Sequence, residues 1–160
     1  MTRSTAGAAL ADTFCSVLRN DGWDLERSGE SPSVVDTLFA GTTTTWRCIA
    51  RVFAEQGQIV FDSVVPLTVE EVRRAEVAYL LTRVNWEILT GAFVLDASSG
   101  EIRFRNSLLV PDSVSLLPPV ALGLVYANVV TVDRCLPDLS HMLLGDESVG
   151  DTLARMGLKD

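Results

Sequence analysis

The single histidine and its nearest cysteine are the first residues to consider for chemistry. Cys135 and His141 lie six residues apart, and a cysteine beside a histidine can become an activated thiol nucleophile. Six residues place the two on poorly aligned faces of a continuous helix, and Pro137 lies between them. A small thiol-dependent enzyme is therefore the less favoured alternative, and we predict no catalytic residues.

The sequence predicts neither a metal site nor a phosphate-binding loop. A structural zinc site needs four ligands and a catalytic one at least three, whereas Cys135 and His141 supply only two. Gly41 precedes four threonines, but the second glycine and the lysine of a phosphate-binding loop are missing. We therefore expect no cofactor.

The arginines of two predicted strands form a more informative pattern. They alternate with other residues, among them Trp46 and Phe104. If these two aromatic side chains face a core, strand alternation sends the arginines to the opposite face of the sheet. The arginines are Arg47, Arg51, Arg103 and Arg105.

Two apolar residues, Ile49 and Phe53, share this predicted arginine face. A mixture of arginine and apolar side chains is typical of protein-binding surfaces. A solvated basic face, ordinary for an antiparallel sheet, explains the pattern equally well. The predicted partner-binding residues are Arg47, Ile49, Arg51, Phe53, Arg103 and Arg105.

Composition and charge narrow the class of protein. The 160 residues are 48 % apolar and 21 % charged, so the chain can bury a core, and we assign residues 1–160 to one domain. A net charge of −8 disfavours nucleic acids, whose phosphates require a basic surface. The three cysteines contain no CxxC pair, so we expect buried, reduced thiols. The N-terminal residues do not resemble a signal peptide, which favours the cytoplasm.

The uncharged stretch from Ser113 to Val132 has the length of a membrane span. It contains two prolines, a glycine and an asparagine, and acidic residues rather than a basic cluster flank it. A buried core helix explains this stretch better, and we predict no membrane partner.

The stretch from Thr68 to Leu89 predicts the central helix. Thr68 would cap its start, with Glu71 three residues on completing a reciprocal capping box. Apolar residues at helical spacing should bury one face against the sheet. They are Val77, Leu81, Val84 and Ile88.

Helices are also expected on either side of this centre. One spans about Thr5–Asn20, and another begins at Pro118, a residue well suited to the first helical position. We expect the second to be interrupted near Pro137 and to end at Gly145. A short C-terminal helix is predicted at residues 148–156.

Alternating patterns predict strands at Val34–Ala40, at Thr43–Glu55 and at Ile59–Val65, where Pro66 should stop the third. A hairpin of two more strands folds at Ser98–Gly100. The order is α-βββ-α-ββ-α. Short connections favour antiparallel pairing, so the predicted fold is α+β, a five-stranded antiparallel sheet with helices mainly on one face.

Residues 10–145 resemble the YbjN-like family in the order of several motifs. The central motif comprises Asn85, Leu89, Gly91, Phe93, Leu95, Gly100, Ile102, Phe104 and Arg105. The flanking motifs comprise Asp21-Gly22, Trp46-Arg47-Cys48, Ser63, Pro66 and the residues from Asp133 to Pro137. The chain departs from the family pattern at Ala92 and in its double proline, Pro118-Pro119.

The resemblance implies a fold like that of type III secretion chaperones, small acidic dimers that bind extended protein segments, and some members are described as sensory-transduction regulators. It supplies no catalytic motif. We predict a non-enzymatic, chaperone-like module that binds a peptide or protein segment and forms a homodimer. Pockets and charge pairing on the sheet face or a helix groove, with edge-strand addition, would provide the binding. The alternative is a regulator that docks a folded signalling partner.

Overall fold

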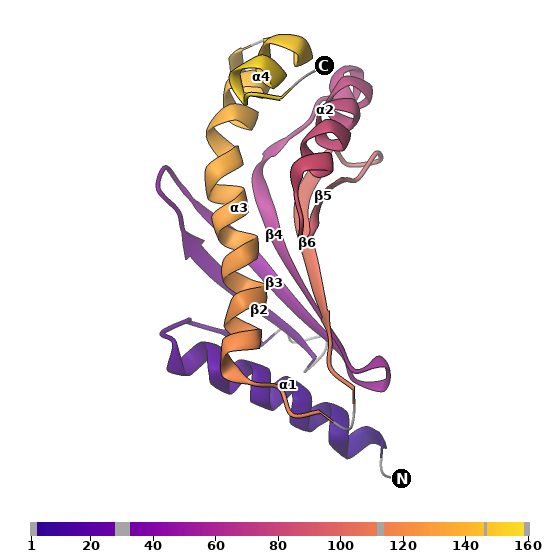
Figure 1. Cartoon of the computed structure of the whole chain (residues 1–160), viewed down its shortest axis with the longest axis vertical. Helices are drawn as coiled ribbons and strands as arrows, with labels where there is room; N and C mark the ends of the chain where they lie inside the picture. Colours follow the sequence, from indigo (N-terminus) through magenta and orange to yellow (C-terminus); the bar gives the residue numbers. More distant parts are fainter. Residues whose placement is uncertain (1–2, 28–32, 112–113, 146, 159–160) are drawn as a thin grey trace.

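An antiparallel sheet organises the chain in the computed structural model, which describes residues 3–27, 33–111, 114–145 and 147–158. The described residues form six strands in the spatial order β1-β2-β3-β4-β6-β5 (Figure 1). The strands are β1 (Glu26–Arg27), β2 (Val34–Ala40), β3 (Thr45–Phe53), β4 (Gln58–Thr68), β5 (Ala92–Leu95) and β6 (Glu101–Leu109). The helices are α1 (Arg3–Asn20), α2 (Arg74–Glu87), α3 (Pro118–Gly145) and α4 (Val149–Arg155).

The helices gather on one face of this sheet. Figure 1 shows α3 lying along the strands and α1 crossing one end. On the covered face, Trp46 of β3 and Phe104 of β6 are buried in one core with α2 and α3. This arrangement confirms the predicted α+β class, the antiparallel pairing and the position of the helices.

The prediction of five strands is wrong by one. Glu26 pairs with Asp36 and Arg27 with Val35, so β1 is a sixth strand at the edge beside β2. Both of its residues are exposed. A two-residue exposed strand carries no alternation of apolar side chains, and the sequence pattern therefore could not reveal it.

The predicted start of the central helix is also wrong. Thr68 ends β4 and pairs with Glu101, so the strand continues past Pro66 through a register irregularity between Val64 and Thr68. Val69 then donates its amide to the Gly100 carbonyl at 2.9 Å. A short 3₁₀ turn at Glu71–Arg73 precedes α2, whose start lacks a side-chain cap. Pairing with β6 outweighs the local capping signal.

The long helix α3 begins at Pro118 and ends at Gly145 as predicted, but it is not interrupted at Pro137. Proline removes one backbone donor, a loss that neighbouring packing can offset. Leu136 and Leu139 are buried on either side of it. The Arg73 guanidinium donates to the Met142 carbonyl at 2.9 Å and fixes the C-terminal end of the helix.

Of the helices that the structure describes, α3 is the one long and apolar enough to cross a membrane by length and composition. Its inward side chains, including Val125, Val129 and Val132, are fully buried in the core. Ser113, at the start of the uncharged stretch, lies outside the described residues. The packing supports the interpretation of a core helix.

Replacing Leu81 with alanine should destabilise the protein by roughly 2–5 kcal/mol, because Leu81 is only 3 % exposed in the core. Chemical denaturation of both proteins measures the difference. Glu87→Ala, at the exposed last position of the same helix, serves as the control and should change stability much less. A Leu81→Ala loss no larger than that of the control would contradict this packing.

Candidate interaction surface

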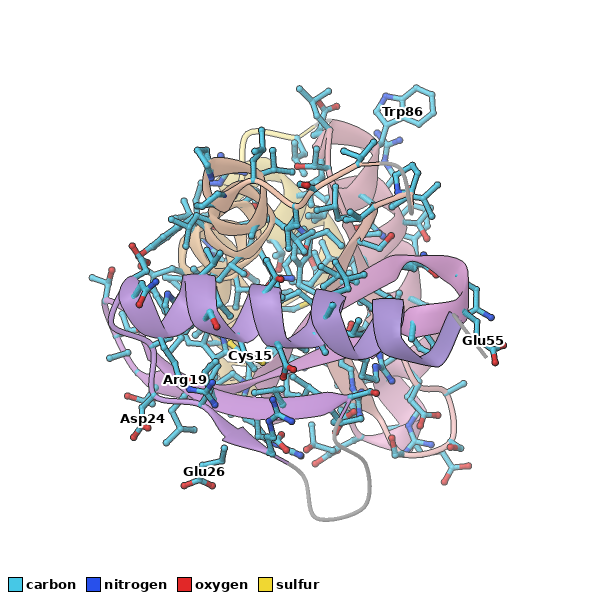
Figure 2. All side chains as sticks on the ribbon, turned by 90° about the horizontal axis from the view of Figure 1, so that it is seen from below. Cys15, Arg19, Asp24, Glu26, Glu55 and Trp86 are labelled. Atoms are coloured by element: carbon cyan, nitrogen blue, oxygen red, sulfur yellow. The ribbon has the colours of Figure 1, made fainter. Side chains whose placement is uncertain are left out.

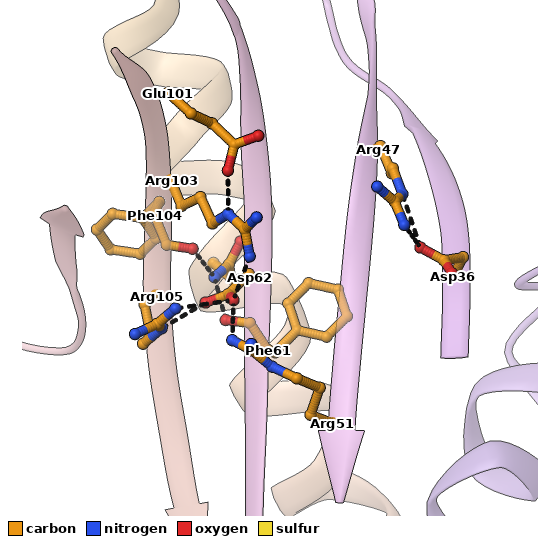
Figure 3. A network of polar contacts seen from close by, with 10 residues as sticks. Asp36, Arg47, Arg51, Phe61, Asp62, Glu101, Arg103, Phe104 and Arg105 are labelled. Atoms are coloured by element: carbon orange, nitrogen blue, oxygen red, sulfur yellow. Dashed lines mark hydrogen bonds and ion pairs between the residues drawn. The ribbon is translucent and has the colours of Figure 1, made fainter. Parts of the chain in front are cut away.

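The face of the sheet opposite the helices centres on Asp62 of β4. Ile49 of β3 pairs with Asp62 on one side, and Arg105 of β6 pairs with it on the other. Arg51 and Arg103 lie on the adjacent rows, opposite Val60 and Val64. Strand alternation therefore places three of the predicted arginines around one carboxylate (Figure 3).

Asp62 is fully buried and accepts charge-assisted hydrogen bonds from this group of arginines. Arg105 binds it in a bidentate manner, with Nε 2.7 Å from Oδ1 and Nη2 3.1 Å from Oδ2. Arg51 contacts Oδ2, and Arg103 Nη1 lies 3.5 Å from the same oxygen. The hydrogen bond to Asp62 raises the pKa of the Arg105 guanidinium. We call Asp62, Arg51, Arg103 and Arg105 the arginine cluster.

Apolar side chains surround this cluster. Ile49 is 7 % exposed and Val60 8 %, although both lie on the face that no helix covers. Long arginine side chains can bury their methylene stems on apolar neighbours while the charged ends stay wet. Further out, Phe53 and Leu109 are exposed at the ends of their strands. The face thus combines charged and apolar contact area.

The fourth predicted arginine does not join the cluster. Arg47 pairs with Asp36 of β2, and its Nε lies 2.7 Å from Oδ1 (Figure 3). Leu38, two residues along β2, is 70 % exposed beside it. The structure therefore brings Arg51, Arg103 and Arg105 together and leaves Arg47 at the β2 side of the same face.

A buried polar network on the covered face positions α3 against the strands. The Asn128 amide nitrogen lies 3.0 Å from the Phe61 carbonyl and 2.9 Å from that of Phe104, on neighbouring strands. The Ser63 hydroxyl donates to Asn128 Oδ1 at 2.6 Å, and Asn106 donates to the Leu124 carbonyl at 2.8 Å. Sequence reasoning missed Asn128, whose only signal is an amide inside an uncharged stretch.

Two further residues of the family motifs hold loops in place. Asn85 accepts from the Phe93 amide at 2.7 Å and donates to the Phe93 carbonyl at 2.9 Å, which secures the start of β5. Asp133 on α3 accepts from the Thr42 amide at 2.7 Å and thereby secures the β2–β3 turn. These residues support the sheet and do not line the open face.

The candidate thiol pair is not brought together. Cys135 is buried, and its burial raises the pKa of the thiol, so little nucleophilic thiolate is present at neutral pH. The His141 side chain is exposed and lies 3.9 Å from Glu147. Burial likewise raises the pKa of Cys48 to about 11. Within the described ranges, no three side chains of the metal-binding types are grouped to hold an ion.

A second candidate surface lies on the outer side of α2. Tyr79 and Trp86 are 48 % and 81 % exposed, and Ala75 and Thr82 share their face at offsets of three and four residues. Figure 2 shows Trp86 pointing away from the rest of the molecule. We call Ala75, Tyr79, Thr82 and Trp86 the α2 stripe. An apolar row of this kind is typical of a contact surface.

Comparison with known proteins addresses the family and the fold. The model of the YbjN family, described as "Putative bacterial sensory transduction regulator", matches residues 10–116. The crystal structure of YbjN from E. coli, described as "a putative transcription regulator", is similar with a TM-score of 0.64 and 16 % identity, over 82 % of this chain and 93 % of that one. The ExsC–ExsE complex matches with a TM-score of 0.44 and 13 % identity, over 85 % and 94 %. No curated protein sequence matched the chain.

Proposed function

The chain belongs to the YbjN family, and from this premise we propose that it is a non-enzymatic module that binds an extended segment of another protein on the open face of its sheet. The solved relative supports the fold, and the geometry of the open face supports the binding role. We also propose a cytoplasmic location, which the free, buried cysteines favour because thiols stay reduced there.

The arginine cluster is the observation that carries this proposal. Three guanidiniums surround Asp62, and Glu101 supplies one further carboxylate to Arg103, so positive charge is in excess by one. In the described part of the chain, the buried Nε of Arg51 has no acceptor. On a chain of net charge −8, this local excess favours an acidic partner group or one rich in carbonyl oxygens.

Affinity would come from the apolar surroundings of the cluster. Exposed ion pairs contribute only about 0–1 kcal/mol each, so charge alone cannot hold a partner. Phe53 at 43 % exposure, Leu38 at 70 % and Leu109 at 65 % provide area that a partner can bury. We infer that the partner segment contacts these residues together with Arg47, Arg51, Arg103 and Arg105, above the largely buried Ile49.

The alternative is a regulator that docks a folded partner. A cavity of about 430 Å³ beside Leu38 favours it, because a protruding side chain of a folded protein could enter there. The cavity is lined by Asp24, Glu26, Asp36, Thr37, Leu38 and Arg47. Peptides that tile the captured partner distinguish the two: a linear segment binds alone in the first case and fails in the second.

We expect Phe53→Glu to weaken partner binding about tenfold, since it buries a carboxylate where an apolar contact should form. Tagged native chain, Phe53→Glu and Val130→Glu capture proteins from the native lysate, and mass spectrometry quantifies them. Val130 is 59 % exposed on α3, away from the open face, and is the matched control. Partners should be lost with Phe53→Glu and retained with Val130→Glu. Equal capture by both variants would refute binding at the open face.

The homodimer remains part of the proposal, and the α2 stripe supports it. In an antiparallel pair of α2 helices, Trp86 would lie opposite Ala75 of the second copy, and Tyr79 opposite Thr82. Each of these facing pairs combines a large side chain with a small one. Such an arrangement is self-complementary and suits a two-fold contact. A stable dimer should bury on the order of 1,200 Å² or more in total.

A further inference from the structure

Strand β6 is longer than the strand beside it. The pairing of β5 with β6 ends at Ala92 and Arg105, whereas β6 continues to Leu109. In Figure 1, β6 extends well past the end of β5. Across the described ranges, no strand pairs with β6 on this side beyond Arg105. Gly91, which precedes β5, still lies beside Asn106, so the last three residues of β6, Ser107 to Leu109, have a free edge.

The backbone directions identify the free hydrogen-bonding groups. The Glu101 carbonyl accepts from the Asp96 amide on the β5 side at 2.9 Å, and the Val110 amide donates to the Gly57 carbonyl on the β4 side at 2.7 Å. Because these directions alternate along a strand, the backbone groups of Ser107 and Leu109 point toward the free edge. Both residues are exposed, and Ser107 also lines a groove along this edge, so a partner strand can approach their backbone groups.

A groove of about 550 Å³ accompanies this edge. Its floor and far wall come from Leu108 of β6 and from Val120, Gly123 and Leu124 of α3. A Cβ atom placed at Gly123 would meet no atom of a neighbouring element within 4 Å, so no close packing contact there requires glycine. Glycine weakens a helix, and an open space above it suits the close approach of another chain.

We propose that this edge and groove bind an extended segment of another protein as an added strand that continues the line of β5. Its residue opposite Leu108 would direct an apolar side chain into the groove, because Leu108 faces the helices and lines that groove. Its alternate residues would lie on the open face, beside Arg105 of the arginine cluster. The excess positive charge there selects carboxylates, so the segment alternates apolar and acidic side chains.

This site extends the proposed function without depending on it. Phe53 lies on β3, and two strands, β4 and β6, separate it from the free edge. The Phe53→Glu variant should therefore bind the added strand normally. A failure at the open face and a failure at the β6 edge can be observed separately.

Selection of random twelve-residue peptides displayed on phage against the full chain tests the proposal. We expect enriched peptides to alternate apolar residues with aspartate or glutamate. Gly123→Phe should reduce their binding at least tenfold, because the ring fills the groove, while thermal stability stays equal or rises. Val130→Phe adds the same ring to the exposed side of α3 outside the groove and should leave binding unchanged.

Synthetic versions of an enriched peptide test the backbone pairing. Every second amide of the bound peptide should face β6, and the amides between them should face away. N-methylation of the first set should abolish binding, and N-methylation of the second set should be tolerated. The proposal is overturned if no peptide is enriched, if the enriched peptides lack alternation, or if Gly123→Phe binds them normally. Equal effects of methylation in the two sets overturn it as well. Loss of self-association in Gly123→Phe, measured by sedimentation, would assign the groove to a second copy instead.

Discussion

Replacing Asp62 with alanine should destabilise the protein by about 3 kcal/mol. The substitution removes the carboxylate on which Arg51, Arg103 and Arg105 converge and leaves three guanidiniums close together. Breaking a buried ion pair costs about 3–5 kcal/mol, and we expect the lower end because the arginines keep 27–42 % of their side-chain exposure. Chemical denaturation of the native and variant chains measures the loss.

Asp36→Ala is the matched control for this experiment. It removes a carboxylate from the same face, but Asp36 pairs with Arg47, which is 57 % exposed. We expect a change of only about 0–1 kcal/mol, as for other exposed ion pairs. If both variants lose the same stability, Asp62 does not hold the cluster together and the electrostatic account of the open face is wrong.

Replacing Trp86 with glutamate should convert the proposed dimer into a monomer. Trp86 is the largest exposed side chain of the α2 stripe, and the two-fold contact would use it twice. Buried tryptophans commonly contribute 2 kcal/mol or more to an interface. We therefore expect the dissociation constant of the dimer to rise by at least about a hundredfold. Sedimentation across micromolar concentrations measures the monomer fraction.

Leu144→Glu provides the control for the dimer, because Leu144 is 78 % exposed at the end of α3, outside the α2 stripe. It should self-associate like the native chain. A native chain that sediments as a monomer at high micromolar concentration would rule out the homodimer. A Trp86→Glu variant that still dimerises would instead exclude the α2 stripe as its surface.

Most of the regular elements could be predicted because the pattern of apolar residues in each of them extends over many positions. Strand β2 has the predicted bounds, and α1 and the hairpin of β5 and β6 follow the pattern of their apolar residues. Alternation also placed the arginines on the face opposite Trp46. These features depend on the direction of side chains within one element, which the sequence encodes locally.

Features that depend on pairing between distant elements were not predictable in this way. Asp62 lies in β4, whose sequence is mostly apolar. The arginines reach Asp62 only because β4 lies between β3 and β6 in the sheet. The separation of Arg47 from the cluster follows from its distance along β3 and from Asp36 on the next strand. The start of α2 was missed because Thr68 is held by Glu101, thirty-three residues later in the chain.

The polar network around Asn128 has a consequence for assembly of the fold. Asn128 on α3 contacts one carbonyl on β4 and one on β6, and these strands must pair correctly before both carbonyls are in place. A slip of one residue between the strands would turn side chains to the opposite face and separate these acceptors. Helix α3 would then bury an unsatisfied amide, at a cost of roughly 1–3 kcal/mol. Docking of α3 therefore discriminates between correct and shifted strand pairing after both strands have formed.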